Sequence, residues 1–325
     1  MNEKTLEVRG LTVCIPTDKG EIFPVNGVSL EVPAGGSVGI VGESGCGKSM
    51  TARAVMGLLR YPGKITGGSV RLCGRELTAL KEKERRKLRG SEISMIFQEP
   101  MTSLNPVVKA GKQVREAIRL HSDCTRSEAK AKVLEMFREV EIPEERIRYS
   151  SYPHQLSGGL RQRVMIAMAM ACKPKLLIAD EPTTALDVTV EAQILSLLER
   201  LRDQGTSVLL ISHNLGVIAK VCDYVYVMYA GRIVEQAETK TLFENPRHPY
   251  TQGLFRSVTS LRKGGDALET IPGVVPNLLR LPAGCSFSLR CESCGENCEK
   301  NVPELAETDP GHKVRCFLTG KEANA

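Results

Sequence analysis

One eight-residue stretch, residues 42–49, constrains the fold of this chain more than any other. Its sequence, Gly-Glu-Ser-Gly-Cys-Gly-Lys-Ser, matches the pattern G-x-x-x-x-G-K-[ST]. In this pattern glycines let backbone N–H groups surround phosphates, while a lysine and a hydroxyl reach the far end of a nucleotide. The apolar residues 37–41 predict a buried strand before the loop, and residues 50–59 predict a helix whose N-terminus attracts anions. We therefore expect an α/β fold with a phosphate-binding loop, rather than a glycine-rich turn that fits the pattern by chance.

The length and net charge of the chain limit how many domains it can form and which partners it can have. The 325 residues suffice for one large domain and a smaller one. The net charge of +6 is mild, and the basic run at residues 81–89 also contains acidic residues, so it predicts an exposed helix. No window approaches the roughly 18 apolar residues that span a bilayer, and the N-terminus lacks a signal-peptide core. We expect a soluble, cytosolic chain that reaches a membrane only through a partner.

Two acidic residues follow a second buried strand. The apolar residues 176–179 lead into Asp180 and Glu181, at the strand end where open α/β sheets bind ligands. Helix caps or loop residues are the alternative for such a pair. With a phosphate loop upstream, we expect Asp180 to hold Mg²⁺ through water and Glu181 to orient or deprotonate the attacking water. His213 ends a further strand and is expected to sense the γ-phosphate, although a lone histidine is more often structural.

The segment between these motifs is mainly helical. A short strand ends in Gln98, whose amide is suited to a metal or a water, and a proline-containing loop follows. Helical patterns come next, one of them opened by the capping-box pair Thr125 and Glu128. Ser157, Gly158 and Gly159 then form a second glycine-rich helix start, before an apolar helix. We expect them to make a second anion contact.

Together these motifs resemble the ATP-binding domain of ABC transporters. The order Leu-Ser-Gly-Gly before an acidic strand is peculiar to that superfamily. The resemblance implies a P-loop ABC ATPase fold, with a RecA-like core, an antiparallel β layer and a helical subdomain. It also implies ATP and Mg²⁺ as cofactors, head-to-tail pairing of two such domains, and catalysis by Lys48, Glu181 and His213. The implied nucleotide contacts are Gly42, Glu43, Ser44, Gly45, Cys46, Gly47, Lys48, Ser49, Met50, Gln98, Asp180, Ser157, Gly158 and Gly159, with Ser49 and Gln98 also on Mg²⁺.

Longer stretches carry a closer resemblance. Residues 95–106, 178–189, 248–251 and 271–276 look like the ATPase subunits of bacterial dipeptide and oligopeptide importers. This likeness covers nearly the whole chain. It implies a second related ABC ATPase as a heterodimer partner, two transmembrane permeases and an external solute-binding protein. The chain would then be peripheral to the cell (inner) membrane on its cytoplasmic side, and the segment after Gln98 would contact a permease.

Five of the eleven cysteines lie near the C-terminus, where the composition shifts to Pro, Gly and Cys. We expect an ABC ATP-binding domain over residues 1–262, with its helical subdomain at about 99–172, and a Cys-rich extension over 263–325. In a cytosolic protein such a cluster suggests a metal rather than disulfides, and thiolates suit iron–sulfur and zinc equally. The importer resemblance implies a [4Fe–4S] cluster held by Cys285, Cys291, Cys298 and Cys316. Zinc and free thiols are the alternatives, and Cys294 leaves the ligand set open.

Other functions compete with that of an ATP-hydrolysing importer motor. A soluble ABC ATPase acting on nucleic acid or ribosomes usually carries long coiled-coil insertions or tandem cassettes, and this chain has neither, so we expect no nucleic-acid partner. A regulatory module would need a broken catalytic set, whereas Lys48, Asp180, Glu181 and His213 are all present. Within the importer family, nickel or another related solute is the alternative cargo.

Overall fold

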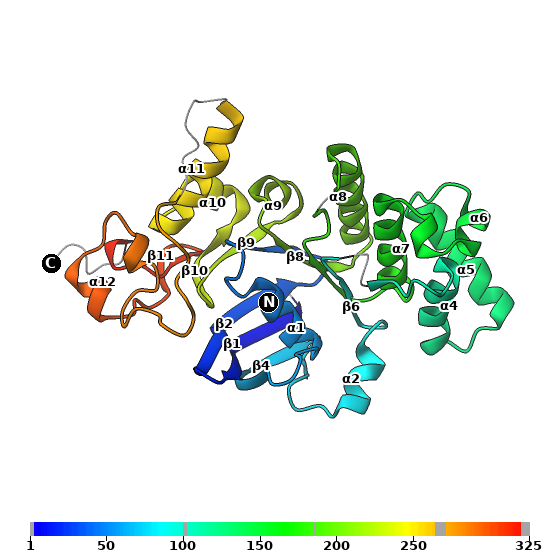
Figure 1. The fold of residues 1–325 in the computed structure, drawn as a ribbon, viewed down its shortest axis with the longest axis horizontal. Coiled ribbons are helices and arrows are strands. Elements are labelled where there is room, and N and C mark those ends of the chain that lie inside the picture. Colours follow the sequence, from blue (N-terminus) through cyan, green and yellow to red (C-terminus); the bar gives the residue numbers. More distant parts are fainter. Residues whose placement is uncertain (1–2, 100–102, 185, 264–270, 320–325) are drawn as a thin grey trace. The chain divides into compact units, whose positions relative to one another are not determined.

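A computed structural model describes residues 3–99, 103–184, 186–263 and 271–319 (Figure 1). Part of the proline-containing loop (100–102), Ala185 in the turn after the acidic pair, and residues 264–270 lie outside the described residues. The chain divides into two compact units. The first comprises Met1–Thr5, Val32–Gly36 and Ala79–Leu210, and the second comprises Leu6–Glu31, Ser37–Thr78 and Ile211–Ala325.

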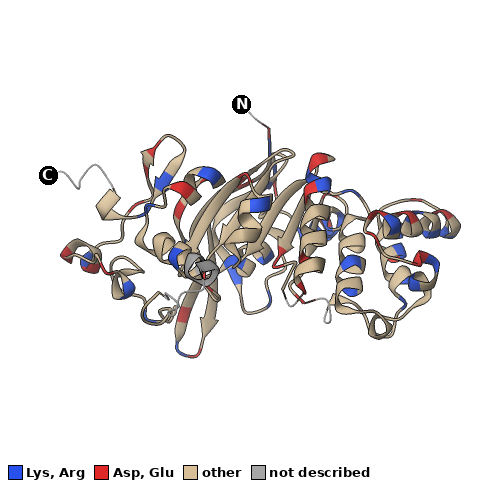
Figure 2. Cartoon of the chain, turned by 90° about the horizontal axis from the view of Figure 1, so that it is seen from above, with Lys and Arg blue, Asp and Glu red and all other residues tan. Residues whose placement is uncertain are grey.

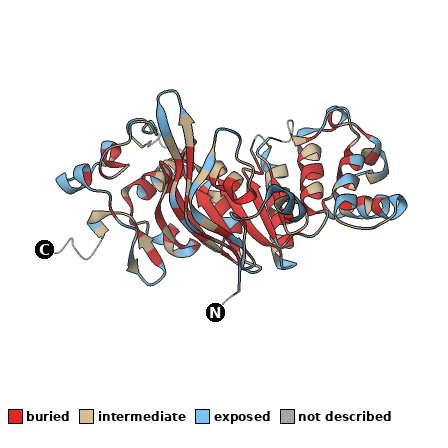
Figure 3. Cartoon of the chain, turned by 90° about the horizontal axis from the view of Figure 1, so that it is seen from below, coloured by how far each residue is buried: buried red, intermediate tan, exposed pale blue. Residues whose placement is uncertain are grey.

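The first unit is built on buried parallel strands. β6 (Ile93–Ile96) pairs in parallel with β7 (Leu176–Asp180), with Ile93 opposite Leu176, and β8 (Ser207–Ser212) is the next strand in the order. The last two residues of β8 belong to the second unit. Every residue of these three strands is buried, as expected for a parallel sheet covered on both faces. Figure 3 shows the same concentration of buried residues in the strands.

Helices make up the rest of this unit. They are α2 (Glu82–Leu88), α4 (Ala110–Leu120), α5 (Arg126–Glu139), α6 (Glu145–Ser150), α7 (Gly158–Met170) and α8 (Val188–Asp203), with a 3₁₀ turn, η1 (Pro153–Gln155). The predicted capping box of α5 is confirmed: Thr125 N–H donates to the Glu128 carboxylate over 2.8 Å, and Glu128 N–H donates to Thr125 Oγ1 over 3.3 Å. Figure 2 shows basic and acidic residues interspersed over these helices, which fits a solvated surface. Within the described ranges, no helix is both long and apolar enough to cross a membrane.

The second unit contains an antiparallel layer with strand order β2-β1-β4-β5. Residues Leu6 and Val8 of β1 lie opposite Leu72 and Val70 of β4, and all four are buried. The ends of β1 and β2 extend into the first unit. The strands are β1 (Lys4–Thr17), β2 (Gly20–Pro33), β4 (Lys64–Leu72) and β5 (Arg75–Glu76). The antiparallel β layer that the resemblance implies is therefore present.

A second group of strands in this unit has the order β11-β12-β10-β9-β3. β3 pairs in parallel with β9, and the remaining pairs are antiparallel. The strands are β3 (Ser37–Val41), β9 (Tyr224–Tyr229), β10 (Arg232–Glu238), β11 (Ala306–Asp309) and β12 (His312–Val314). The helices are α1 (Lys48–Met56), α9 (Leu215–Val221), α10 (Thr239–Glu244), α11 (Pro249–Lys263) and α12 (Glu296–Lys300). The C-terminal segment thus adds two strands to the sheet through β10.

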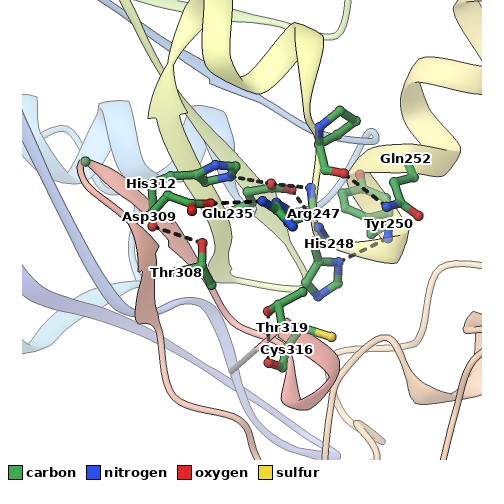
Figure 4. A network of polar contacts seen from close by, with 12 residues as sticks. Glu235, Arg247, His248, Tyr250, Gln252, Thr308, Asp309, His312, Cys316 and Thr319 are labelled. Carbon is green, nitrogen blue, oxygen red and sulfur yellow. Dashed lines mark hydrogen bonds and ion pairs between the residues drawn. The ribbon is translucent and has the colours of Figure 1, made fainter. Parts of the chain in front are cut away.

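A buried carboxylate fastens this C-terminal addition (Figure 4). Glu235 of β10 is fully buried and accepts hydrogen bonds from the backbone N–H groups of Arg247 (2.7 Å) and His248 (3.0 Å). Its Oε1 is also hydrogen-bonded to His312 Nε2 of β12, over 2.7 Å. A buried carboxylate is costly unless its oxygens are paired. These contacts therefore hold β12 and the segment before α11 against β10.

Candidate functional site

The phosphate loop joins β3 to α1 in the second unit. Gly47 caps α1 with φ 111° and ψ 0°, and Gly42 also has a positive φ, 152°. A Cβ atom at Gly42 would overlap the carbonyl oxygen of Met228, and one at Gly47 would overlap that of Pro24. Both positions therefore require glycine on conformational and steric grounds. The strand and the helix predicted on either side of the loop are confirmed, although the helix begins at Lys48.

The Lys48 side chain lies inside this loop. It is buried, and its Nζ donates to the carbonyl oxygens of Gly42 (2.7 Å) and Glu43 (3.0 Å). Cys46 Sγ is 3.8 Å from the same nitrogen. Burial raises the pKa of the Cys46 thiol, so the thiol stays neutral and the lysine charge is not neutralised by a thiolate. A cationic group held by loop carbonyls suits the predicted contact with phosphate.

The predicted catalytic residue Glu181 and the predicted Mg²⁺ contact Gln98 meet in the first unit. Asp180 is the buried last residue of β7, and Glu181 follows it with φ 47°. Gln98 comes shortly after β6, the parallel neighbour of β7, so both side chains leave the same edge. Gln98 Nε2 donates to Glu181 Oε2 over 3.0 Å, and Thr184 Oγ1 donates to the same oxygen over 3.0 Å. These two neutral donors orient the carboxylate. The roles of Asp180, Glu181 and Gln98 toward Mg²⁺ and water stay predictions.

The second glycine-rich motif opens α7, also in the first unit. Ser157 is its N-cap, and its Oγ accepts a hydrogen bond from Leu160 N–H over 3.3 Å. Ser157 and Gly158 are exposed, and a Cβ at Gly158 would meet nothing within 4 Å. Gly159 lies close to Val190 of α8. The start of this 13-residue helix is thus accessible from outside the unit. The contact of this helix start with an anion stays a prediction.

His213 lies in the second unit, directly after β8, and is exposed. The next residue, Asn214, caps α9 by accepting a hydrogen bond from Gly216 N–H over 2.9 Å. The cap fixes the chain direction after the strand and leaves the histidine at the strand end, as predicted. Its role as a γ-phosphate sensor stays a prediction.

Arg290 is a residue that sequence reasoning missed. Its Nη1 lies 2.7 Å from Glu43 Oε2 and its Nη2 3.0 Å from Glu43 Oε1, which ties the C-terminal segment to the phosphate loop. Both residues belong to the second unit. The hydrogen bonds to the Glu43 carboxylate raise the pKa of the Arg290 guanidinium, so the guanidinium stays charged. No local pattern signals this contact, because 247 positions separate the two residues.

The four predicted cysteine ligands influence one another. Cys285 N–H donates to the Cys298 carbonyl oxygen over 2.7 Å. Burial raises the pKa of Cys285 to about 11, and the charges of Cys298, Cys316 and Cys291 also raise it. Nevertheless, in the described ranges no three His, Cys, Asp or Glu side chains form a group that could hold a metal ion. The structure therefore does not support the [4Fe–4S] cluster or the zinc alternative.

Comparison with known proteins decides the family. A family model described as ABC transporter matches residues 25–184, and one described as oligopeptide/dipeptide transporter, C-terminal region, matches residues 234–298. The oligopeptide transport ATP-binding protein OppD of Salmonella typhimurium is 51% identical over 318 residues, which cover 98% of this chain and 94% of that protein. This chain belongs to the ABC transporter ATP-binding proteins. OppD of Escherichia coli is 50% identical to this ABC ATPase over the same length.

A solved structure supports the same assignment at the level of the fold. The dimeric post-hydrolysis state of the ATP-binding cassette MJ0796, bound to ADP and phosphate, matches this ABC ATPase with a TM-score of 0.66 at 27% identity. The match covers 72% of this chain and 98% of that one. The predicted P-loop ABC ATPase fold is therefore confirmed, and ATP hydrolysis is the activity of the family to which the chain belongs.

Proposed function

We propose that this ABC ATPase is the motor subunit of an importer that takes up dipeptides or oligopeptides. The single observation that carries the proposal is the match of residues 234–298 to the C-terminal region of oligopeptide/dipeptide transporters, beyond the ATPase motifs. The names of the similar OppD proteins agree with it. The alternative is that the same motor serves a related importer, which takes up nickel or another related solute.

The residues of the chain divide the work of hydrolysis. Lys48 binds the outer phosphates, while Glu181, oriented by Gln98 and Thr184, accepts a proton from the attacking water. As the family resemblance implies, Ser49 and Gln98 would hold Mg²⁺ directly and Asp180 would hold it through water, and the bound ion would neutralise charge on the phosphates. His213 contacts the γ-phosphate and reports its presence.

Enclosing the bound nucleotide requires a second ATPase subunit. Ser157, Gly158 and Gly159 present the accessible start of α7, which would cover a nucleotide held by the partner's phosphate loop. The similarity to a cassette solved as a dimer supports such pairing. A related, non-identical ATPase completes the heterodimer, and two permeases and an external solute-binding protein complete the importer. The chain is then peripheral to the inner membrane, on its cytoplasmic side, with the helices after Gln98 against a permease.

The residues after 262 form the Cys-rich extension of the ABC domain. From the likeness to the importer ATPases, we propose that Cys285, Cys291, Cys298 and Cys316 hold a [4Fe–4S] cluster. Iron content and visible absorbance of anaerobically purified protein test it. Zinc without iron, or no metal, would contradict the cluster and leave the importer function untouched.

Affinity purification of the tagged chain from membranes tests the importer function. We expect a second ABC ATPase and two permeases to co-purify, and ATP hydrolysis by the reconstituted complex to rise when peptide-loaded binding protein is added. Stimulation by a nickel-loaded binding protein instead would reassign the cargo. Association with nucleic acid that falls steeply with salt, without permeases, would contradict the proposal.

A further inference from the structure

The Arg290 side chain, in the C-terminal segment, forms two hydrogen bonds to Glu43 of the phosphate loop. Arg290 ends the 3₁₀ turn η2 (Ser288–Arg290), and its side chain is only 3% exposed. Its two terminal nitrogens contact the two oxygens of Glu43 at 2.7 and 3.0 Å. Such parallel, charge-assisted hydrogen bonds fix both the distance and the orientation of the partners. Because the Arg290 side chain is buried and that of Glu43 is 26% exposed, the pair is less open to solvent than a surface ion pair, which contributes little.

The surroundings of Arg290 are built to hold it in one position. Its Nε donates to the Pro272 carbonyl oxygen over 2.9 Å, and Nη2 donates to that of Ile271 over 3.3 Å. The guanidinium carbon lies 5.9 Å from the centre of the Tyr229 ring, within range of a cation–π interaction. Gly273 packs against its stem, where a Cβ would come within 3.2 Å of Arg290 Cγ. Contacts other than those to Glu43 therefore also hold the guanidinium in place.

Glu43 is held at its main chain too. Its N–H donates to the Tyr250 hydroxyl over 2.8 Å, and its carbonyl oxygen accepts from Lys48 Nζ over 3.0 Å. Tyr250 is fully buried, with its ring centre 4.6 Å from that of Tyr229. Glu43 is thus held at three points: Tyr250 binds its N–H, Lys48 binds its carbonyl oxygen and Arg290 binds its side chain.

We propose that Arg290 is a positioning residue for nucleotide binding, because its clamp on Glu43 holds the phosphate loop in the conformation that accepts ATP. The C-terminal segment then takes part in nucleotide binding without touching the nucleotide. A glycine-rich loop loses much conformational freedom when it becomes ordered, and a clamp made before binding reduces that loss. The inference rests on the ATP-binding function of Lys48 and its loop. It concerns affinity, because the clamp acts on the loop that holds the phosphates.

Nucleotide affinity of the full-length chain tests the inference. Equilibrium binding of a fluorescent ATP analogue with Mg²⁺ is compared for the wild type, Arg290→Gln and two controls. We expect Arg290→Gln to bind about tenfold more weakly, the factor that corresponds to ordering roughly one residue's backbone. The kcat at saturating ATP should stay within about twofold of the wild type, so the loss falls on KM.

The controls separate positioning from general loosening of the segment. Arg280→Gln changes an exposed arginine of the same segment and should bind ATP like the wild type. Arg315→Gln removes donors to the carbonyl oxygens of Ile233 and Pro303, which anchor the segment elsewhere. It should lower the melting temperature with little change in ATP affinity. If Arg315→Gln weakened ATP binding as much as Arg290→Gln, the inference would be overturned.

A double-mutant cycle tests whether Arg290 acts through Glu43. Glu43→Gln alone should weaken binding about as much as Arg290→Gln, and the two together should add nothing further. Additive losses would overturn the inference. If Arg290→Gln fails to fold, Arg290→Lys replaces it. Lysine keeps the positive charge but cannot form the two parallel hydrogen bonds, so the variant should lose part of the ATP affinity. Absence of ATP binding by the wild type would refute the proposed function, whereas equal binding by wild type and folded Arg290 variants would refute only the inference.

Discussion

Gln98 and Glu181, which lie 83 residues apart in the sequence, are joined by a hydrogen bond of 3.0 Å from the Gln98 amide to the Glu181 carboxylate. The parallel pairing of β6 with β7 brings them to one edge of the first unit. Because Thr184 donates to the same oxygen, the carboxylate is held from two directions. The general-base role that we propose for Glu181 requires a carboxylate of fixed orientation, and these two donors fix it.

Glu181→Gln should abolish most ATP turnover while leaving ATP binding intact. The amide is isosteric but cannot accept a proton from water, and general-base catalysis typically contributes about 10²- to 10⁴-fold to the rate. We expect kcat to fall by roughly that factor, with ATP-stabilised dimers persisting in gel filtration. Glu139→Gln, an exposed change on α5, serves as the matched control. Unchanged hydrolysis by Glu181→Gln in the assembled complex would contradict the role of Glu181.

Two glycines of the phosphate loop provide a matched pair for stability. Gly45 and Gly47 both have positive φ, but a Cβ at Gly45 meets nothing within 4 Å, whereas one at Gly47 overlaps the Pro24 carbonyl oxygen. Gly45→Ala should cost about 1–2 kcal/mol of unfolding free energy, the strain of the left-handed region. Gly47→Ala should cost about 2 kcal/mol more, since backbone must shift. Urea denaturation measures both, and equal losses would argue against the steric account.

His248 predicts a loss of stability in acid. Burial lowers the pKa of His248 from 6.5 to about 3. Between these values the unfolded chain binds a proton that the folded chain does not, so stability falls as the pH falls from about 6.5 toward 3. The slope is at most about 1.4 kcal/mol per pH unit, or roughly 2 kcal/mol between pH 7 and pH 5.

Denaturation at pH 7 and pH 5 checks this, with His248→Gln compared with the wild type. The variant should lose that part of the pH dependence, because it has no imidazole to protonate. His154→Gln, a change at an exposed histidine, should keep the wild-type dependence. A His248→Gln variant as acid-sensitive as the wild type would show that other groups govern the loss.

The cysteine proposal predicts a contrast between neighbours. Cys291→Ser should remove most of the iron from anaerobically purified protein, since serine is a poor ligand for an iron–sulfur cluster. Cys294→Ser, three residues away, should retain iron and the visible absorbance. The reverse pattern would place Cys294 in the ligand set instead of Cys291. Full iron in both variants would exclude each as a required ligand.

The sequence allowed accurate prediction wherever apolar runs or local chemistry carried a signal. The strand at residues 37–41 coincides with β3, in which every residue is buried, and the capping box at Thr125 opens α5. In the site, the expected ends of two buried strands led to Gln98 and Glu181, although not to their direct hydrogen bond.

Contacts between residues far apart in the sequence could not be predicted, because no local sequence pattern marks them. The strand Ala306–Asp309 has no buried residue and pairs at the edge of the sheet, so it lacks the alternation that marks a half-buried strand. Arg290 reads locally as one more charged residue in a segment rich in Pro, Gly and Cys. Only the tertiary structure pairs it with Glu43. Cysteine spacing likewise suggested ligands without fixing the positions of their sulfur atoms.

The pairing of β12 with β10 bears on how this protein can be shortened. A chain cut before residue 306 would lack β11 and β12, and would leave the backbone N–H and C=O groups along one side of β10 without strand partners. Such an open border readily recruits strands from other molecules. Truncated versions that keep all the ATPase motifs but discard the tail are therefore expected to aggregate.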